Sequence, residues 1–294
     1  MKLGKSRLAQ LAIALVAASA ASTASAALVT LWDYSVTTQF NGNNVFGANG
    51  TGGTQTETAR QVSWGYQFGD VFTNTGNINT NRSGITISDV GPGTNDPTVN
   101  AQIGQVTTGA VSIPGIGLGA WITHHNNPIS GGFETLTSTQ IDSTLTLTPN
   151  TPPTPGQQGP STLTFTVFFA ETPNATPCTA PSPAGNPCND IFALNPSQSF
   201  NQSFVFDGQT YFVSTFPIAG GGLSTFLPLT LAECAAAGAN PGCVGFTTVE
   251  GQNTTVQFGF AITAQPISIP EPGSLALGGL ALAALGLMRR RKTS

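Results

Sequence analysis

The sequence predicts an all-β protein whose central part folds as an antiparallel β-sandwich, jelly-roll-like and with long loops. Short apolar segments dominate that part, apolar and polar side chains alternate along them, and a two-residue turn joins one pair. A short apolar helix is expected at each end of the chain. The expected strands are 28–38, 61–68, 84–89, 101–113, 135–148, 162–170, 199–206, 209–216 and 254–263.

The alternation is clearest in residues 141–148. Ile141, Leu145 and Leu147 share one parity, and threonines occupy the positions that follow Leu145 and Leu147. A period of two places one set of side chains on each face of a strand. Residues 162–168 repeat the pattern, so both segments are predicted to be half-buried strands.

Turn and cap residues define the connections. Asp207 and Gly208 predict a type I′ hairpin, because both positions tolerate positive φ. One short helix is expected after Thr230, where Glu233 can complete a capping box and Gly238 can end the helix. Polar loops are expected at 41–58, 152–160 and 173–187.

The charge of the central part differs from that of the whole chain. Between Ala27 and Ile269 the only basic residues are Arg60 and Arg82, whereas every acidic residue except Glu271 lies there, which gives 2 − 12 = −10. Such an acidic surface repels phosphate backbones and excludes nucleic-acid binding. We expect one domain over 27–266.

All four cysteines lie in the central part: Cys178, Cys188, Cys234 and Cys243. Four cysteines allow three disulfide pairings, and the local one closes two short loops. The alternative is a zinc site, but paired zinc ligands are usually about two to four residues apart, whereas nine and eight residues separate these pairs. We therefore expect disulfides and no metal.

The N-terminus has the three parts of a secretory signal peptide. Lys2, Lys5 and Arg7 precede an uncharged run over 8–21, and Ala24-Ser25-Ala26 ends it. A buried N-terminal helix is the alternative. We expect signal peptidase to remove 1–26, so that the protein works outside the cytoplasm, where disulfides persist.

The C-terminal segment, 267–294, also combines three features. A Pro-Glu-Pro box is followed by an apolar run over 275–288 and then by a basic cluster. The fourteen apolar residues would form a helix of about 21 Å at ~1.5 Å per residue, against about 30 Å of hydrocarbon. Transient membrane insertion as a transmembrane helix, with the basic end in the cytoplasm, is compatible with this length, but physics alone does not separate it from a buried terminal helix.

In order and position these features resemble the PEP-CTERM sorting tail. The residues that carry the resemblance are Pro270, Glu271, Pro272, Arg289, Arg290 and Arg291. In that family an exosortase, a membrane peptidase, removes the tail near the Pro-Glu-Pro box. The resemblance implies an address on the cell surface or in the extracellular matrix, and it does not reveal what the delivered domain does.

The two histidines of the chain, His124 and His125, are neighbours. On a strand they would face opposite sides, so one metal ion could not readily take both. One of them could still ligate a metal together with Asp or Asn residues from elsewhere in the chain. The favoured alternative is that Thr123, His124 and Asn126 hydrogen-bond to backbone at a strand end and fix a turn.

Thr123, His124 and Asn126, followed by Asn127-Pro128-Ile129, resemble the Thr-His-x-Asn signature of the THxN family of PEP-CTERM proteins. The resemblance implies membership in that family. It assigns no activity to the motif.

No catalytic motif stands out: the chain contains no Gly-x-Ser-x-Gly elbow, no His-Glu-x-x-His helix and no phosphate-binding loop. We expect no catalytic residue and no cofactor. Two weaker alternatives remain open, paired carboxylates and a calcium loop. The first would use Asp70, Asp89, Glu134 or Asp142, and the second would use Asp89, Asn95 and Asp96.

Three functions are therefore weighed. The favoured one is a non-catalytic exported protein, sorted by exosortase to the surface or to extracellular polysaccharide, with a structural role in biofilm. The second is a carbohydrate- or calcium-binding module, in which exposed aromatic residues and the 123–126 turn contact sugar. The third is a secreted hydrolase, which requires two carboxylates across a groove.

Overall fold

The computed structural model describes the central part of the chain. The described residues are 27–47, 50, 52–65, 82–94, 96–129, 131–156, 162–180, 188–195, 200–219, 222–223 and 227–267. The helices expected within 1–26 and at 275–288 lie outside them. Among the described residues, no helix is long and apolar enough to cross a bilayer.

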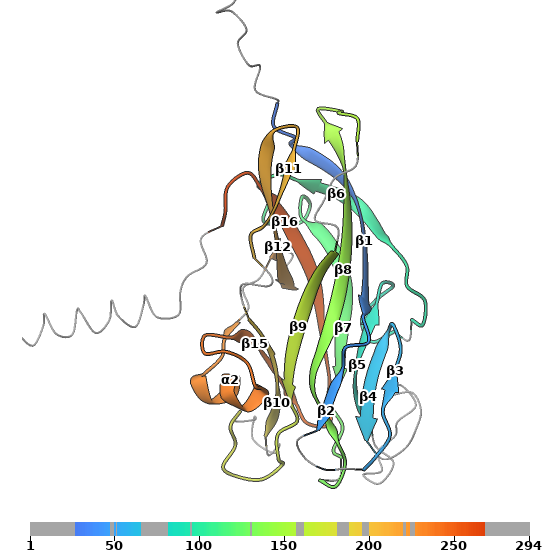
Figure 1. Ribbon diagram of the computed structural model, residues 1–294, viewed down its shortest axis with the longest axis vertical. Helices are drawn as coiled ribbons and strands as arrows, with labels where there is room; N and C mark the ends of the chain where they lie inside the picture. The colour runs from blue at the N-terminus through green and yellow to red at the C-terminus, as the bar shows by residue number, and fades with distance from the viewer. Residues whose placement is uncertain are drawn as a thin grey trace, which may run out of the picture.

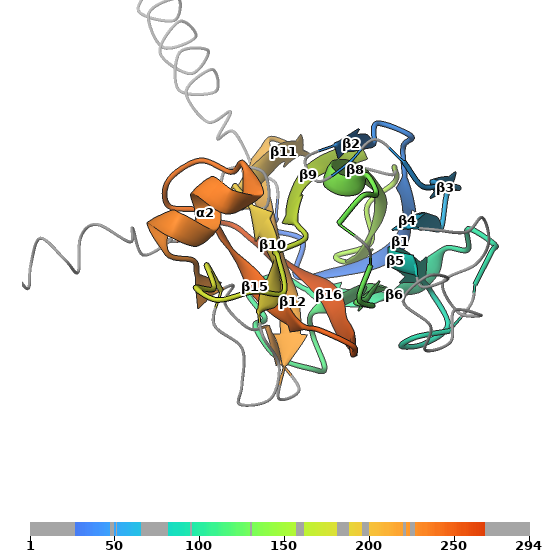
Figure 2. The same cartoon turned by 90° about the horizontal axis from the view of Figure 1, so that it is seen from below.

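The described strands form two curled antiparallel sheets that pack face to face (Figure 1, and end-on in Figure 2), which confirms the predicted β-sandwich. In the first sheet the order is β14 (Leu227–Pro228), β15 (Val244–Val249), β10 (Asn189–Leu194), β9 (Thr162–Ala170), β8 (Thr135–Thr151), β1 (Leu31–Phe40) and β6 (Gln102–Thr107), and β2 (Val45–Gly47) also pairs with β8. In the second sheet it is β11 (Gln202–Phe206), β12 (Gln209–Ala219), β16 (Asn253–Thr263), β7 (Gly117–His125), β5 (Arg82–Ser88), β4 (Gln61–Gly65) and β3 (Thr56–Glu57), and β13 (Gly222–Leu223) pairs with β12.

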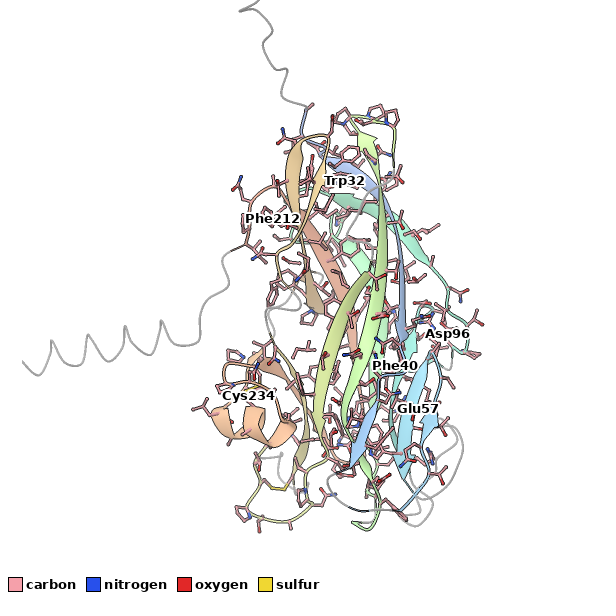
Figure 3. The ribbon with its side chains drawn as sticks, in the orientation of Figure 1. Trp32, Phe40, Glu57, Asp96, Phe212 and Cys234 are labelled. Atoms are coloured by element: carbon pink, nitrogen blue, oxygen red, sulfur yellow. A yellow bond between two sulfur atoms is a disulfide. The ribbon has the colours of Figure 1, made fainter. Side chains whose placement is uncertain are left out.

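The period-two pattern drives the packing of the first sheet. In β8, Ile141, Leu145 and Leu147 are buried while the threonines beside them are partly or fully exposed. Facing side chains of the two sheets form two apolar clusters along the sandwich. One contains Phe40 and the other contains Trp32, which Figure 3 labels at different heights. Burying these faces is the main stabilising contribution.

The expected strand 101–113 is wrong beyond Thr107. The chain turns there, because Gly109 has φ 87° and donates its N–H to the carbonyl of Ile262 at 2.7 Å. Strand β7 was not predicted, since its first half is rich in glycine. Those glycines allow close packing: a Cβ on Gly117 would lie 2.1 Å from the Phe260 ring.

The predicted hairpin and the predicted capping box are both confirmed. Asp207 and Gly208 have φ values of 47° and 75°, and Phe206 pairs with Gln209. Helix α2 (Leu231–Ala237) starts at Thr230, whose hydroxyl accepts from the Glu233 N–H, and it ends at a left-handed Gly238.

The cysteines form the local pair of disulfides, Cys178–Cys188 and Cys234–Cys243. No cysteine remains free for a thiolate zinc site. The second disulfide ties α2 to the start of β15, and the helix packs on β10 and β9, beside β10 in Figure 1.

Gly208→Ala is expected to lower the free energy of unfolding by about 1–2 kcal/mol, the usual cost of a left-handed residue that carries a Cβ. Gly131→Ala is the matched control, because an added Cβ there meets no atom and Gly131 has no positive φ. Denaturant unfolding of both variants measures the difference. Equal losses would contradict the role of the turn.

Candidate functional site

The motif of residues 123–126 lies at the end of a central strand. β7 is paired on both sides, so that His124 lies between Ile85 of β5 and Thr254 of β16. The two histidine rings therefore face opposite sides of the sheet. His125 contacts the Thr86 hydroxyl within the second sheet at 2.9 Å, whereas His124 reaches Thr248 of the first sheet at 2.8 Å.

His124 is a buried, neutral residue of the core. Its ring stacks on Trp64 with centroids 6.2 Å apart and meets Phe169 edge-on at 4.9 Å. Burial, and secondly the charge of His125, lower the pKa of His124 to about 3. Its Nε2 has no hydrogen-bond partner among the described residues.

Asn126 links the same two sheets. Its Nδ2 donates to the carbonyl of Thr248 at 3.2 Å, and its side chain is 1 % exposed. The motif thus forms two hydrogen bonds with Thr248: His124 bonds to its hydroxyl and Asn126 bonds to its backbone carbonyl. A hydrogen bond to backbone at the strand end agrees with the favoured interpretation for Asn126, while His124 bonds to a side chain instead.

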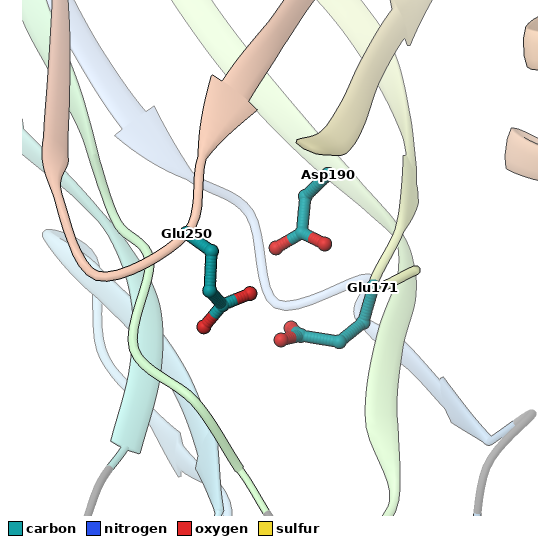
Figure 4. Close-up of side chains that lie close together, drawn as sticks. All are labelled: Glu171, Asp190 and Glu250. Carbon is teal, nitrogen blue, oxygen red and sulfur yellow. The ribbon is translucent and has the colours of Figure 1, made fainter. Parts of the chain in front are cut away.

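Three carboxylates converge beside this motif. Glu171 follows β9, Asp190 lies in β10 and Glu250 follows β15, and one ligand oxygen from each lies within 4.8 Å of the others. Figure 4 shows the three side chains pointing toward one another. Asp190 is 0 % and Glu250 is 8 % exposed, whereas Glu171 is half-buried.

Strand register explains why these acids meet. Ala170 pairs with Ile191, which brings the end of β9 beside the start of β10. Asp190 pairs with Thr248, which brings the end of β15 to the same place. The acids are 19 and 60 residues apart in the chain, so no local spacing reveals them.

Few hydrogen bonds satisfy the cluster. The Glu171 carboxylate accepts from the Trp64 indole at 3.0 Å, and Asp190 Oδ1 accepts from the Thr172 N–H at 2.8 Å. Contacts from Asn126 to Asp190 and from Asn174 to Glu250 lower the pKa of these two acids, but among the described residues Asp190 Oδ2 and both Glu250 oxygens have no hydrogen bond of good geometry. Buried carboxylate oxygens in this state are uncommon and call for a ligand or a proton.

The pKa shifts of the three acids also indicate that the cluster needs a ligand or a proton. Burial is the largest cause that raises the pKa of each acid, and mutual repulsion raises the pKa of Glu171 and Asp190 further. Both basic residues of the central part are engaged elsewhere: Arg60 pairs with Asp89, and Arg82 donates to the Ser63 hydroxyl at 3.0 Å. The cluster can hold shared protons or a hard cation.

The described acids that were singled out from the sequence have other hydrogen-bond partners. Asp89 forms an ion pair with Arg60, and the Asp96 carboxylate accepts from the Asp89 N–H at 3.0 Å, so both acids stabilise the loop that contains them. Glu134 accepts from Gln55 at 2.9 Å, and Asp142 accepts from Thr164 at 2.7 Å. Asp70 and Asn95 lie outside the described residues.

Glu250→Gln is expected to stabilise the protein in a chelating buffer at neutral pH. The folded-state pKa of Glu250 is raised above its ordinary value of 4.5, so its contribution to stability is full below that pH and is lost as the pH rises. The gain in free energy of unfolding, variant minus wild type, should be close to zero below about pH 4 and grow toward neutrality. Denaturant unfolding across this range checks it, and a gain independent of pH would contradict it.

Comparison with known proteins identifies the end of the chain. Residues 268–292 match the family model of the PEP-CTERM protein-sorting motif. No curated protein matches the sequence. The matched range contains Pro270, Glu271, Pro272 and the arginines 289–291, all outside the described residues. The motif implies an exported protein that is processed by exosortase and sorted to the cell surface.

Proposed function

We propose that the protein is a non-catalytic exported protein of the THxN type, which exosortase delivers to the cell surface or to the extracellular polysaccharide matrix, where it has a structural role in biofilm. The observation that carries the proposal is the sorting motif over 268–292. Everything between the signal peptide and this motif is then the delivered cargo.

The junction between sandwich and tail supports this division. The last described strand, β16, ends at Thr263, and the chain contacts the sandwich again at Ile267. Ile267 donates its N–H to Asn201 at 2.8 Å, accepts from the Asn201 amide at 3.0 Å and packs on the core. Cleavage at the Pro-Glu-Pro box, three residues further on, would leave these contacts intact.

The Thr-His-x-Asn motif supports a structural role rather than a recognition role. Thr123, His124 and Asn126 are at most 2 % exposed, so sugar cannot reach them. Their partners are the buried Thr248 of β15 and the partly buried Thr255 of β16, so the motif holds β7 against both strands. Trp32 and Trp64 are fully buried as well and offer no platform for a sugar ring.

A second candidate function is cation binding, which the carboxylate cluster favours. Convergent oxygen atoms are what a calcium-binding module requires. A hydrolase would instead need two carboxylates across an accessible groove, and in this cluster two of the three acids are buried.

The sorting proposal is tested by mass spectrometry of protein recovered outside the cell of the natural host. The wild-type protein should start near Ala27 and lack Arg289–Ser294. A variant with Pro270, Glu271 and Pro272 all changed to Ala should keep its tail and stay with the membrane fraction. Pro266→Ala, outside the matched motif, is the control and should be processed normally. An intact tail on exported wild-type protein would refute the proposal.

A further inference from the structure

We infer that Glu171, Asp190 and Glu250, together with the Asn126 amide oxygen, bind one divalent cation, which we assign as calcium. The inference goes beyond the delivery role proposed above and does not depend on it. The site is built from both sheets, because the acids come from the first sheet and Asn126 comes from the end of β7 in the second.

The spacing of the oxygens suits a single calcium ion. Calcium–oxygen bonds are about 2.3–2.6 Å long, so ligands on opposite sides of one ion are up to about 5 Å apart. One oxygen from each of the three carboxylates lies within 4.8 Å of the others. The three side chains can therefore share one ion with little movement.

Asn126 is the independent observation that points to a ligand. Its side chain is 1 % exposed, and its Oδ1 has no hydrogen-bond partner among the described residues. Its Nδ2 donates to the carbonyl of Thr248, the residue paired with Asp190, and a hydrogen bond from the Asn126 side chain to the Asp190 carboxylate, which lowers the pKa of Asp190, places the amide at the cluster. An unsatisfied buried amide oxygen next to buried carboxylates is a natural fourth ligand.

The charge inventory leaves no other counter-ion in the central part. Three acids in a low-dielectric interior require compensation, and neither Arg60 nor Arg82 supplies it. A divalent cation would compensate most of this charge at once. Protonation is the competing explanation, and the titration below separates the two.

The ligand chemistry selects calcium over other divalent ions. Carboxylate and amide oxygens are hard ligands, whereas zinc prefers nitrogen and sulfur, and all four cysteines are in disulfides. Magnesium requires shorter bonds of about 2.0–2.1 Å in a near-ideal octahedron.

Terbium, a luminescent substitute for calcium, provides a direct test on the purified chain with both termini. Trp64 donates its indole N–H to Glu171, so a bound terbium ion should luminesce when tryptophan is excited. Calcium should displace it with a Kd of about 10⁻⁴–10⁻³ M, the range of extracellular calcium modules. Trp64→Phe should abolish the signal, and Trp32→Phe, which alters a tryptophan in the other cluster, should not.

Variants of the ligands complete the test. Glu250→Gln should weaken calcium binding at least about tenfold, and the rise in Tm with calcium should disappear. Glu57→Gln is the matched control, since Glu57 is an exposed acid on β3, and it should bind as the wild type does. Should Glu250→Gln fail to fold, the terbium and calcium competition on wild-type protein decides alone.

Three results would overturn the inference. The first is no calcium-sensitive terbium signal and no rise in Tm with calcium at neutral pH. The second is wild-type affinity in Glu250→Gln. The third is stabilisation by magnesium without stabilisation by calcium. Since all measurements use purified protein, their outcome does not depend on whether exosortase removes the tail.

Discussion

The structure depends on the requirement that each sheet bury one apolar face against the other. Alternation along β1, β8 and β9 meets this requirement in the first sheet, and Trp32 and Phe40 mark the two clusters that result. At some places, polar groups of the two sheets meet across this interior. Thr248 is such a place, because it receives both His124 and Asn126 from the opposite sheet.

A second constraint is the scarcity of positive charge. Only two basic residues lie between Ala27 and Ile269, and one of them, Arg60, is paired with Asp89. The protein nevertheless places Glu171, Asp190 and Glu250 together where three strands end. Such a cluster opposes folding unless a proton or a cation joins it, so it is a feature that packing alone does not explain.

Sequence reasoning recovered what depends on local chemistry. Alternation located β8 and β9, Asp207-Gly208 located the hairpin, and Thr230 with Glu233 located α2. It missed β7 because glycine weakens the strand signal, and only the fit of Gly117 against Phe260 explains why glycine is there. It missed the carboxylate cluster because register, which sequence spacing does not encode, brings the acids together.

The disulfides and the acid cluster lie on the same strands, and this placement connects the fold to its destination. Cys188 directly precedes β10 and Cys243 directly precedes β15, the two strands that also carry Asp190 and lead to Glu250. Disulfides persist in oxidising compartments outside the cytoplasm. The proposed calcium ion would bind near the end of β10 that follows Cys188, and at the end of β15 that is opposite to Cys243. The strands that carry the buried acid cluster are therefore also the strands next to both disulfides, and disulfides agree with the export that the sorting motif at the end of the chain implies.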